Sequence, residues 1–141
     1  MQKVILDTNM LLVPGQHKVD IFTELDRILE ESYELVLLET SIDELKGLAS
    51  GTGADAQAAK LGLMLVEHHR KRDFAAATGS MCKALKTISS SKKEHVDDAI
   101  VRIAEDGTLV ATNDNGLKRR LLEKGVRVIY LRQQKTLAIS T

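Results

Sequence analysis

The chain has 141 residues, of which 43% are apolar and 28% are charged, as is typical of one soluble globular domain rather than a disordered or fibrous protein. Lysine and arginine together number 20, as do aspartate and glutamate, so a nucleic-acid partner would have to bind a local basic patch. The single cysteine, Cys82, excludes a disulfide framework and a Cys-based zinc site. Its apolar runs are too short for a signal peptide or a membrane span, so we expect a cytoplasmic protein without a membrane partner.

Strand-like and helix-like segments alternate along the chain. In order, we expect a strand at residues 4–6, a helix at 22–29, a strand at 36–38, helices at 42–49 and 55–72, a strand at 83–88, a helix from His95, a strand at 109–111, a helix at 117–122 and a strand at 126–131. Thr40 or Ser41 is expected to cap the second helix, and Gly125 to end the last one. This alternation predicts an α/β sandwich with a mostly parallel sheet, formed by one domain over residues 1–141.

Two acids follow predicted strands. Asp7 comes directly after the first strand, and Asp114 follows the strand at 109–111 after two polar residues. Ligands of parallel sheets bind beyond the carboxyl ends of the strands, so both acids are candidates for a site. Asp114 taken alone is better explained as a helix cap than as a ligand, whereas Asp7 ends a buried strand and is harder to explain that way.

Two predicted helices add further acids. At about 100° per residue, Glu44 and Asp97 border the apolar faces of their helices, whereas Asp43 and Asp98 point away from them. An acid at the border of a buried face can reach the end of the sheet. Glu44 and Asp97 therefore join Asp7 and Asp114 as candidates.

Four converging carboxylates are costly without a cation, because two like charges about 4 Å apart repel by roughly 4 kcal/mol at an effective dielectric constant near 20. Such a cluster either has raised pKa values or holds a divalent metal ion. Oxygen ligands without histidine or cysteine suit Mg²⁺ or Mn²⁺. Such an ion can activate water and stabilise charge on a phosphoryl group. The residues therefore favour metal-assisted hydrolysis of phosphodiester bonds.

The acids stand in an ordered set of short motifs: Leu6-Asp7-Thr8-Asn9, Glu44-Leu45, Asp97-Asp98-Ala99-Ile100 and Thr112-Asn113-Asp114. In order and spacing this set resembles the PIN-domain nucleases, over nearly the whole chain. The segment from Val110 to Leu121 and the strand at 126–131 most resemble the archaeal relatives of the PIN endonuclease that processes small-subunit ribosomal RNA. The zinc ribbon of another rRNA-processing branch is absent, because only Cys82 is present.

The resemblance implies a three-layer, Rossmann-like α/β/α sandwich and a metal-dependent endoribonuclease, with homodimerisation. Its four catalytic and metal-binding acids correspond to Asp7, Glu44, Asp97 and Asp114, with Asp98 as an additional metal ligand. Asn9 and Thr112 match polar positions that would orient a carboxylate or a water. Water would attack phosphorus and leave 5′-phosphate and 3′-hydroxyl ends on single-stranded or structured RNA, with precursor rRNA as the expected substrate.

Three consecutive cations follow the last acid. Lys118, Arg119 and Arg120 are candidates for binding RNA phosphate. The other explanation is a solvated helix whose cations offset the dipole of its carboxyl end, and the sequence does not choose between the two.

Three other functions fit parts of the pattern. A VapC-type toxin shares the fold and the acids but cuts tRNA or mRNA and pairs with an antitoxin. A non-catalytic PIN scaffold for ribosome assembly would usually lack one acid, and here all four positions are filled. A haloacid-dehalogenase-type phosphatase needs a second aspartate two residues after the first, where this chain has Asn9.

Overall fold

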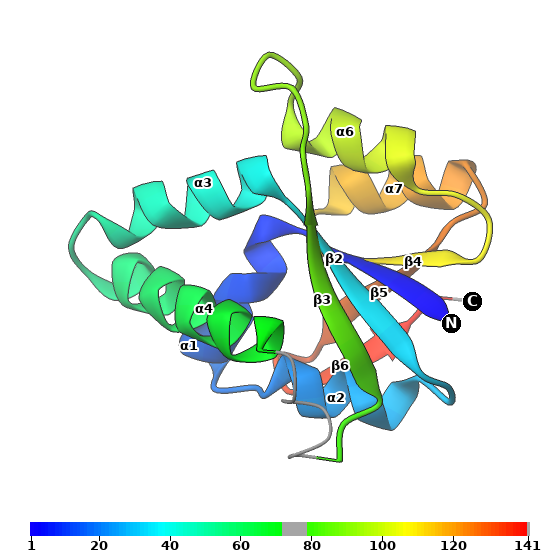
Figure 1. Ribbon diagram of the computed structural model, residues 1–141, viewed down its shortest axis with the longest axis horizontal. Coiled ribbons are helices and arrows are strands. Elements are labelled where there is room, and N and C mark those ends of the chain that lie inside the picture. Colours follow the sequence, from blue (N-terminus) through cyan, green and yellow to red (C-terminus); the bar gives the residue numbers. More distant parts are fainter. Residues whose placement is uncertain (72–78, 141) are drawn as a thin grey trace.

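Six strands form one sheet in the order β3-β2-β1-β4-β5-β6 (Figure 1). They are β1 (Gln2–Leu6), β2 (Tyr33–Leu38), β3 (Cys82–Ile88), β4 (Thr108–Ala111), β5 (Arg127–Arg132) and β6 (Thr136–Ile139) in a computed structural model that describes residues 1–71 and 79–140. Strands β1 to β5 pair in parallel, and β6 pairs antiparallel with β5. The predicted mostly parallel α/β sandwich is thus confirmed, including the strand expected at 83–88, while β6 was not foreseen.

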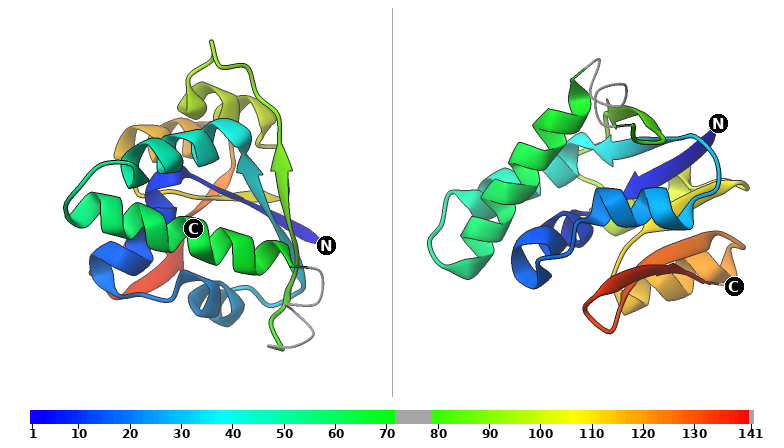
Figure 2. Two further views of the ribbon diagram at one scale, coloured as in Figure 1. Left: turned by 60° about the vertical axis from the view of Figure 1, so that its left-hand side comes forward. Right: turned by 90° about the horizontal axis from the view of Figure 1, so that it is seen from below.

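Helices cover both faces of this sheet (Figures 1 and 2). They are η1 (Thr8–Leu12), α1 (Val13–His17), α2 (Ile21–Ile28), α3 (Glu39–Ala49), α4 (Ala54–Arg70), α6 (Val96–Ile103) and α7 (Asn115–Glu123). Alternate residues of β1 point to opposite layers: Val4 and Leu6 join the core that includes residues of η1, α2 and α4, and Ile5 joins the core with α6 and α7. The three-layer arrangement follows from this alternation.

The residues that follow β1 form two short helices, η1 and α1, which pack closely on α4. A Cβ atom at Gly62 of α4 would lie 2.5 Å from the carbonyl oxygen of Leu11. At Gly15 of α1 it would lie 2.6 Å from Cα of Ala58. Both glycines allow an approach that any larger residue would block, and they hold η1 behind the end of β1.

Helix ends show where the predictions hold and where they fail. Gly125, with φ of +87°, follows the end of α7 as predicted. The predicted cap of α3 was wrong, because α3 begins at Glu39 without a side-chain cap and Thr40 Oγ1 instead lies 2.8 Å from Ser90 Oγ. The predicted end of the long helix at Arg72 lies outside the described residues.

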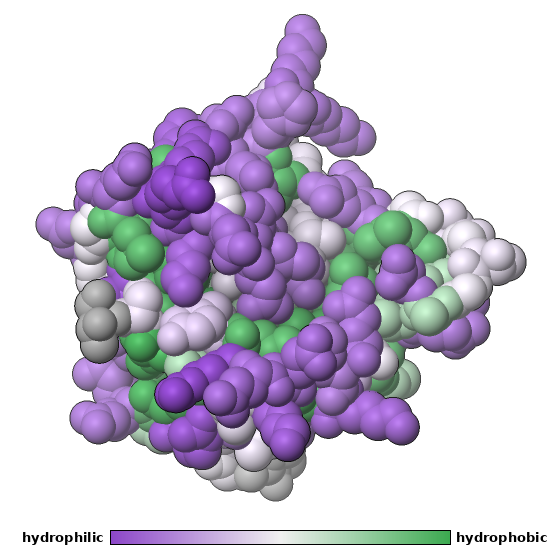
Figure 3. Space-filling model, turned by 180° about the vertical axis from the view of Figure 1, so that it is seen from behind, coloured by the Kyte–Doolittle hydropathy of each residue, from purple (hydrophilic) through white to green (hydrophobic). Residues whose placement is uncertain are grey.

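The exterior is largely polar. On the face shown in Figure 3, hydrophilic residues predominate and hydrophobic patches lie between them. Across residues 1–71 and 79–140, no helix combines the length and apolar content that a membrane span requires.

Candidate active site

The carboxyl ends of β1 and β4 lie side by side. Leu6 pairs with Ala111, and the backbone N–H of Asp7 donates to the carbonyl of Ala111 at 3.0 Å. The backbone N–H of Thr112 donates in turn to Ile129 of β5 at 2.9 Å. These bonds place the polar residues that follow the two strands next to each other.

Asp7 is the most buried of the predicted acids, with 5% of its surface exposed. Its Oδ1 accepts the N–H of Thr8 at 2.8 Å, and its Oδ2 accepts the hydroxyl of Thr112 at 2.7 Å. The oxygen of Thr112 also accepts the N–H of Asp114 at 3.1 Å. The fully buried Thr112 therefore links the first acid to the last, at a position where the sequence predicts a supporting hydroxyl.

Asp114 caps helix α7, as its interpretation as a helix cap predicts. Its Oδ1 accepts the N–H of Leu117 at 3.0 Å. The side chain still lies close enough to Asp7 and Asp97 to raise the pKa of each. Asp114 is thus a cap and a member of the acidic cluster at the same time.

Glu44 and Asp97 come to the same edge from α3 and α6. Glu44 is exposed as a residue, but partial burial of its carboxyl group raises its pKa, and the charges of Asp7 and Asp97 raise it further. Burial likewise raises the pKa of Asp97, with Asp114 as the next cause. Burial also raises the pKa of Asp7. The hydrogen bonds from Thr112 and Thr8 lower this pKa, and the charges of Asp97 and Asp114 raise it again, with a net rise. Asp7 and Asp97 therefore interact electrostatically with each other and with Asp114, and both act on Glu44.

The side chain of Asp98 has a different direction from that of Asp97 and forms an ion pair with Arg120. Its Oδ1 lies 2.9 Å from a guanidinium nitrogen of Arg120, in an ion pair whose two side chains are about half exposed. It raises the pKa of Asp97 but is not among the causes that shift Asp7 or Glu44. The geometry favours Asp97 over Asp98 as the acid directed at the site.

The side chain of Asn9 is hydrogen-bonded to the backbone of a loop and not to a carboxylate. Its Oδ1 accepts the backbone N–H of Asn113 at 3.2 Å, and Oδ1 of Asn113 accepts the N–H of Leu131 at 2.8 Å. This chain of bonds ties η1 to the loop after β4 and then to β5. No role for Asn113 was apparent from the sequence, because the two residues to which it is hydrogen-bonded lie 104 and 18 positions away along the chain.

The three predicted RNA-binding cations have different surroundings. Lys118 Nζ lies 3.7 Å from the ring centroid of Tyr130, a cation–π contact. Arg119 is exposed, and Arg120 is held by Asp98. Lys118 is therefore the cation that packs against β5 and lines a pocket with Thr112 and Asn113.

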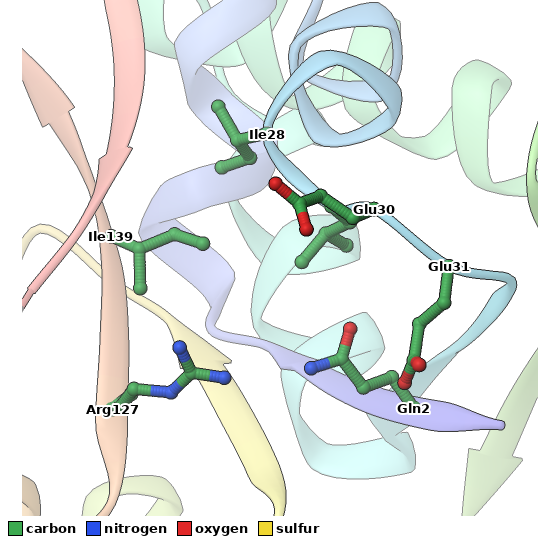
Figure 4. Close-up of a pocket in the computed structure, with 7 residues that line it drawn as sticks. Gln2, Ile28, Glu30, Glu31, Arg127 and Ile139 are labelled. Carbon is green, nitrogen blue, oxygen red and sulfur yellow. The ribbon is translucent and has the colours of Figure 1, made fainter.

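Two pockets lie at opposite ends of the sheet. One, of about 330 Å³, shares Asn9, Thr112 and Lys118 with the region just described. The other, of about 360 Å³, lies at the amino ends of β1 and β5, where Gln2 and Arg127 point toward each other (Figure 4). Only the first of these pockets adjoins the acids.

The acids suit a hydrated divalent cation chemically. All are oxygen donors, and Glu44 and Asp97 have no hydrogen-bond partner among the described residues. In the part of the chain that the structure describes, no three histidine, cysteine or acidic side chains are grouped closely enough to hold a metal ion by themselves. Mg²⁺ ordinarily keeps several waters and binds through one or two carboxylates, which such a looser cluster can provide.

Comparisons with known proteins find a family model and two curated relatives that resemble this chain. The family model described as "PIN like domain" matches residues 4–134. Ribonuclease VapC4 of Methanocaldococcus jannaschii is 29% identical, over 96% of this chain and 94% of the relative. Ribonuclease VapC9 of Archaeoglobus fulgidus is 28% identical, over 93% and 84%.

Solved structures share the fold. The PIN domain endonuclease Utp24 matches with a TM-score of 0.68 and 22% identity, over 98% of this chain and 90% of that one. A domain of a functionally unknown protein from Methanocaldococcus jannaschii matches with a TM-score of 0.63 and 15% identity, over 94% and 92%. At these identities the likeness concerns the fold alone.

Proposed function

Because this chain belongs to the PIN-like domain family, we propose that it is a metal-dependent endoribonuclease that hydrolyses phosphodiester bonds within RNA. The observation that carries this proposal is the meeting of Asp7, Glu44, Asp97 and Asp114, from four separate segments, at the carboxyl edge of the sheet. The names of the two ribonuclease relatives support it.

These four acids would hold the cation, Mg²⁺ or Mn²⁺. When bound, such an ion activates water and stabilises negative charge on the phosphoryl group. Thr112 fixes the orientation of the Asp7 carboxylate, and the N–H of Leu117 fixes that of Asp114. Lys118, one turn along α7 from Asp114, would attract the RNA backbone.

The products would carry 5′-phosphate and 3′-hydroxyl ends. A route through the RNA 2′-hydroxyl needs a general base and a general acid, typically a pair of histidines. Among the described residues, only one histidine, His95, is among the causes that shift the pKa values of these acids, so a pair is not placed beside them. Hydrolysis by water leaves the 2′-hydroxyl unused. A 2′,3′-cyclic phosphate on the product would contradict this mechanism.

For the substrate we favour precursor ribosomal RNA in the cytoplasm, on the resemblance of the segment from Val110 to Leu121 to the rRNA-processing branch. The fold shared with the Utp24 endonuclease is compatible with this assignment. The second candidate is a VapC-type toxin, which the names of the two curated relatives favour. A tightly bound small protein partner encoded next to this chain would support the toxin.

The experiment is cleavage of end-labelled precursor-rRNA fragments, tRNA and hairpin RNAs by the purified chain, with Mn²⁺, Mg²⁺ or EDTA. We expect metal-dependent cuts at few positions in the precursor fragments and slower cutting of tRNA. Preferential cutting of tRNA would favour the toxin instead. Equal rates with metal and with EDTA would contradict the proposed function and leave the scaffold interpretation.

A further inference from the structure

The pocket beside the acids is built from three separate parts of the chain. Its walls come from η1 and α1, from the loop after β4 together with the start of α7, and from the β5–β6 hairpin. Figure 2 shows α1 and the β5–β6 turn on the same side of the molecule. Thr112 lines the pocket and donates to Asp7, so the pocket begins where the acidic cluster ends.

Neutral carboxamides dominate the lining of this pocket. Asn9 and Asn113 are committed to the bonds that hold the wall together. Asn115 and Gln134, by contrast, are exposed and have no hydrogen-bond partner among residues 1–71 and 79–140. Each offers a donor and an acceptor side by side, the arrangement that pairs with the edge of a nucleobase.

Strained backbone surrounds the same pocket. Within the described residues, the non-glycine residues with positive φ are Lys18 (55°), Gln133 (53°) and Gln134 (59°). Lys18 follows His17, which lines the pocket, and Gln134 lines it directly. Two central residues with positive φ in a tight hairpin turn favour glycine or asparagine, so the glutamines are not what folding alone would select there.

We propose that this pocket binds the nucleobase of the RNA residue adjoining the scissile phosphate and thereby sets a base preference at the cleavage site, an inference that rests on the proposed ribonuclease function. Asn115 and Gln134 read the edge of the base, while Lys118 contacts the neighbouring phosphate. The volume of about 330 Å³ is that of a small-ligand site. Because only an unstacked base can enter, the RNA must be single-stranded at this residue.

The experiment is cleavage of a single-stranded RNA pool with randomised sequence in Mn²⁺, followed by sequencing of the new ends. Gln134→Gly removes the carboxamide and tolerates the positive φ, and Asn115→Ala removes the other. Glu30→Ala, in the pocket at the far end of the sheet, is the matched control. Thermal unfolding of each variant verifies that it is folded.

We expect the wild type to prefer one base, about tenfold, at one fixed position relative to the cut. Both pocket variants should reduce this preference to less than about threefold, and Glu30→Ala should keep it. Cleavage without base preference, or an unchanged preference in both pocket variants, would overturn the nucleobase site and leave the nuclease intact. Absence of any metal-dependent cleavage by the wild type would overturn the nuclease itself, and the nucleobase site with it.

Discussion

Asp7 occupies a position that is unfavourable for a carboxylate without a cation. Burial raises its pKa, the hydrogen bonds from Thr112 and Thr8 lower it, and the charges of Asp97 and Asp114 raise it again, with a net rise. A group whose pKa is raised by folding stabilises the protein below its unfolded pKa. That contribution is lost as the pH rises through the folded pKa.

Asp7→Asn should therefore make the metal-free protein more stable at pH 7, by a few degrees in Tm. The carboxamide oxygen can still accept the Thr8 N–H, and the buried charge is gone. In EDTA, thermal unfolding from pH 7 down to pH 3 should show the advantage shrinking as the wild-type Asp7 becomes protonated. Added Mn²⁺ should raise the Tm of the wild type more than that of the variant. A variant less stable than the wild type at every pH would contradict this account.

Thr112 is a positioning residue, since it acts through the Asp7 carboxylate. Thr112→Val removes the hydroxyl that donates to Asp7 and accepts from Asp114, and we expect a loss of about 10- to 100-fold in Mn²⁺ affinity. Thr112→Ser keeps the hydroxyl and should retain most of the Mn²⁺ affinity. Titration of Mn²⁺ binding by calorimetry tests both, and equal affinities for the valine and serine variants would rule the role out.

The neighbouring acids Asp97 and Asp98 should differ in their effect on catalysis. Asp97→Asn removes an acid that interacts with Asp7, Glu44 and Asp114, and it should slow RNA cleavage by about 100-fold or more. Asp98→Asn breaks an exposed ion pair with Arg120 and should slow it less than about fivefold. Single-turnover rates in Mn²⁺ provide the comparison, and the reverse order would exchange the two assignments.

At the scale of the elements, the packing of η1 and α4 supports the acid at the end of β1. Gly62 of α4 lies against the backbone of Leu11, where a Cβ atom has no room. Gly47 of α3 has nothing within 4 Å of the equivalent position. Glycine thus permits close packing in α4, whereas in α3 it only lowers the stability of the helix.

Gly62→Ala and Gly47→Ala should change stability in opposite directions. We expect Gly62→Ala to lower the free energy of unfolding by about 1–3 kcal/mol through overpacking. Gly47→Ala should raise it by about 0.5–1 kcal/mol through helix propensity. Urea unfolding at constant m-value measures both, and stabilisation by Gly62→Ala would show that η1 and α4 are less closely packed than described.

Helices and strands with a clear periodicity of apolar residues were predictable from the sequence, whereas the short elements were not. The strands at the centre of the sheet and the helices around Phe22, Leu45 and Ile100 follow from apolar spacing. Helix α1 has five residues, and β6 has four and depends on pairing with β5. Segments this short show no period, so tertiary contacts decide their structure.

At the scale of the whole molecule, parallel topology brings the acids together. Helices α3, α6 and α7 all begin at the edge where the parallel strands end, which is why residues from 7 to 114 meet there. Strand ends and helix faces predicted the four acids from the sequence, and their catalytic and metal-binding roles stay a prediction. The pocket beside them was not predictable, because contacts such as Lys118 on Tyr130 and Asn9 on Asn113 depend on how loops from different strands meet.

The most direct test of the proposed nuclease is the single-turnover rate of RNA cleavage in Mn²⁺ for wild type, Asp7→Asn and Asp43→Asn. Asp7 lies in the acidic cluster, whereas Asp43 is an exposed acid on α3 and serves as the matched control. We predict at least about a 100-fold loss for Asp7→Asn and wild-type rates for Asp43→Asn. Equal rates for wild type and Asp7→Asn would contradict the assignment of the acidic cluster as the catalytic centre.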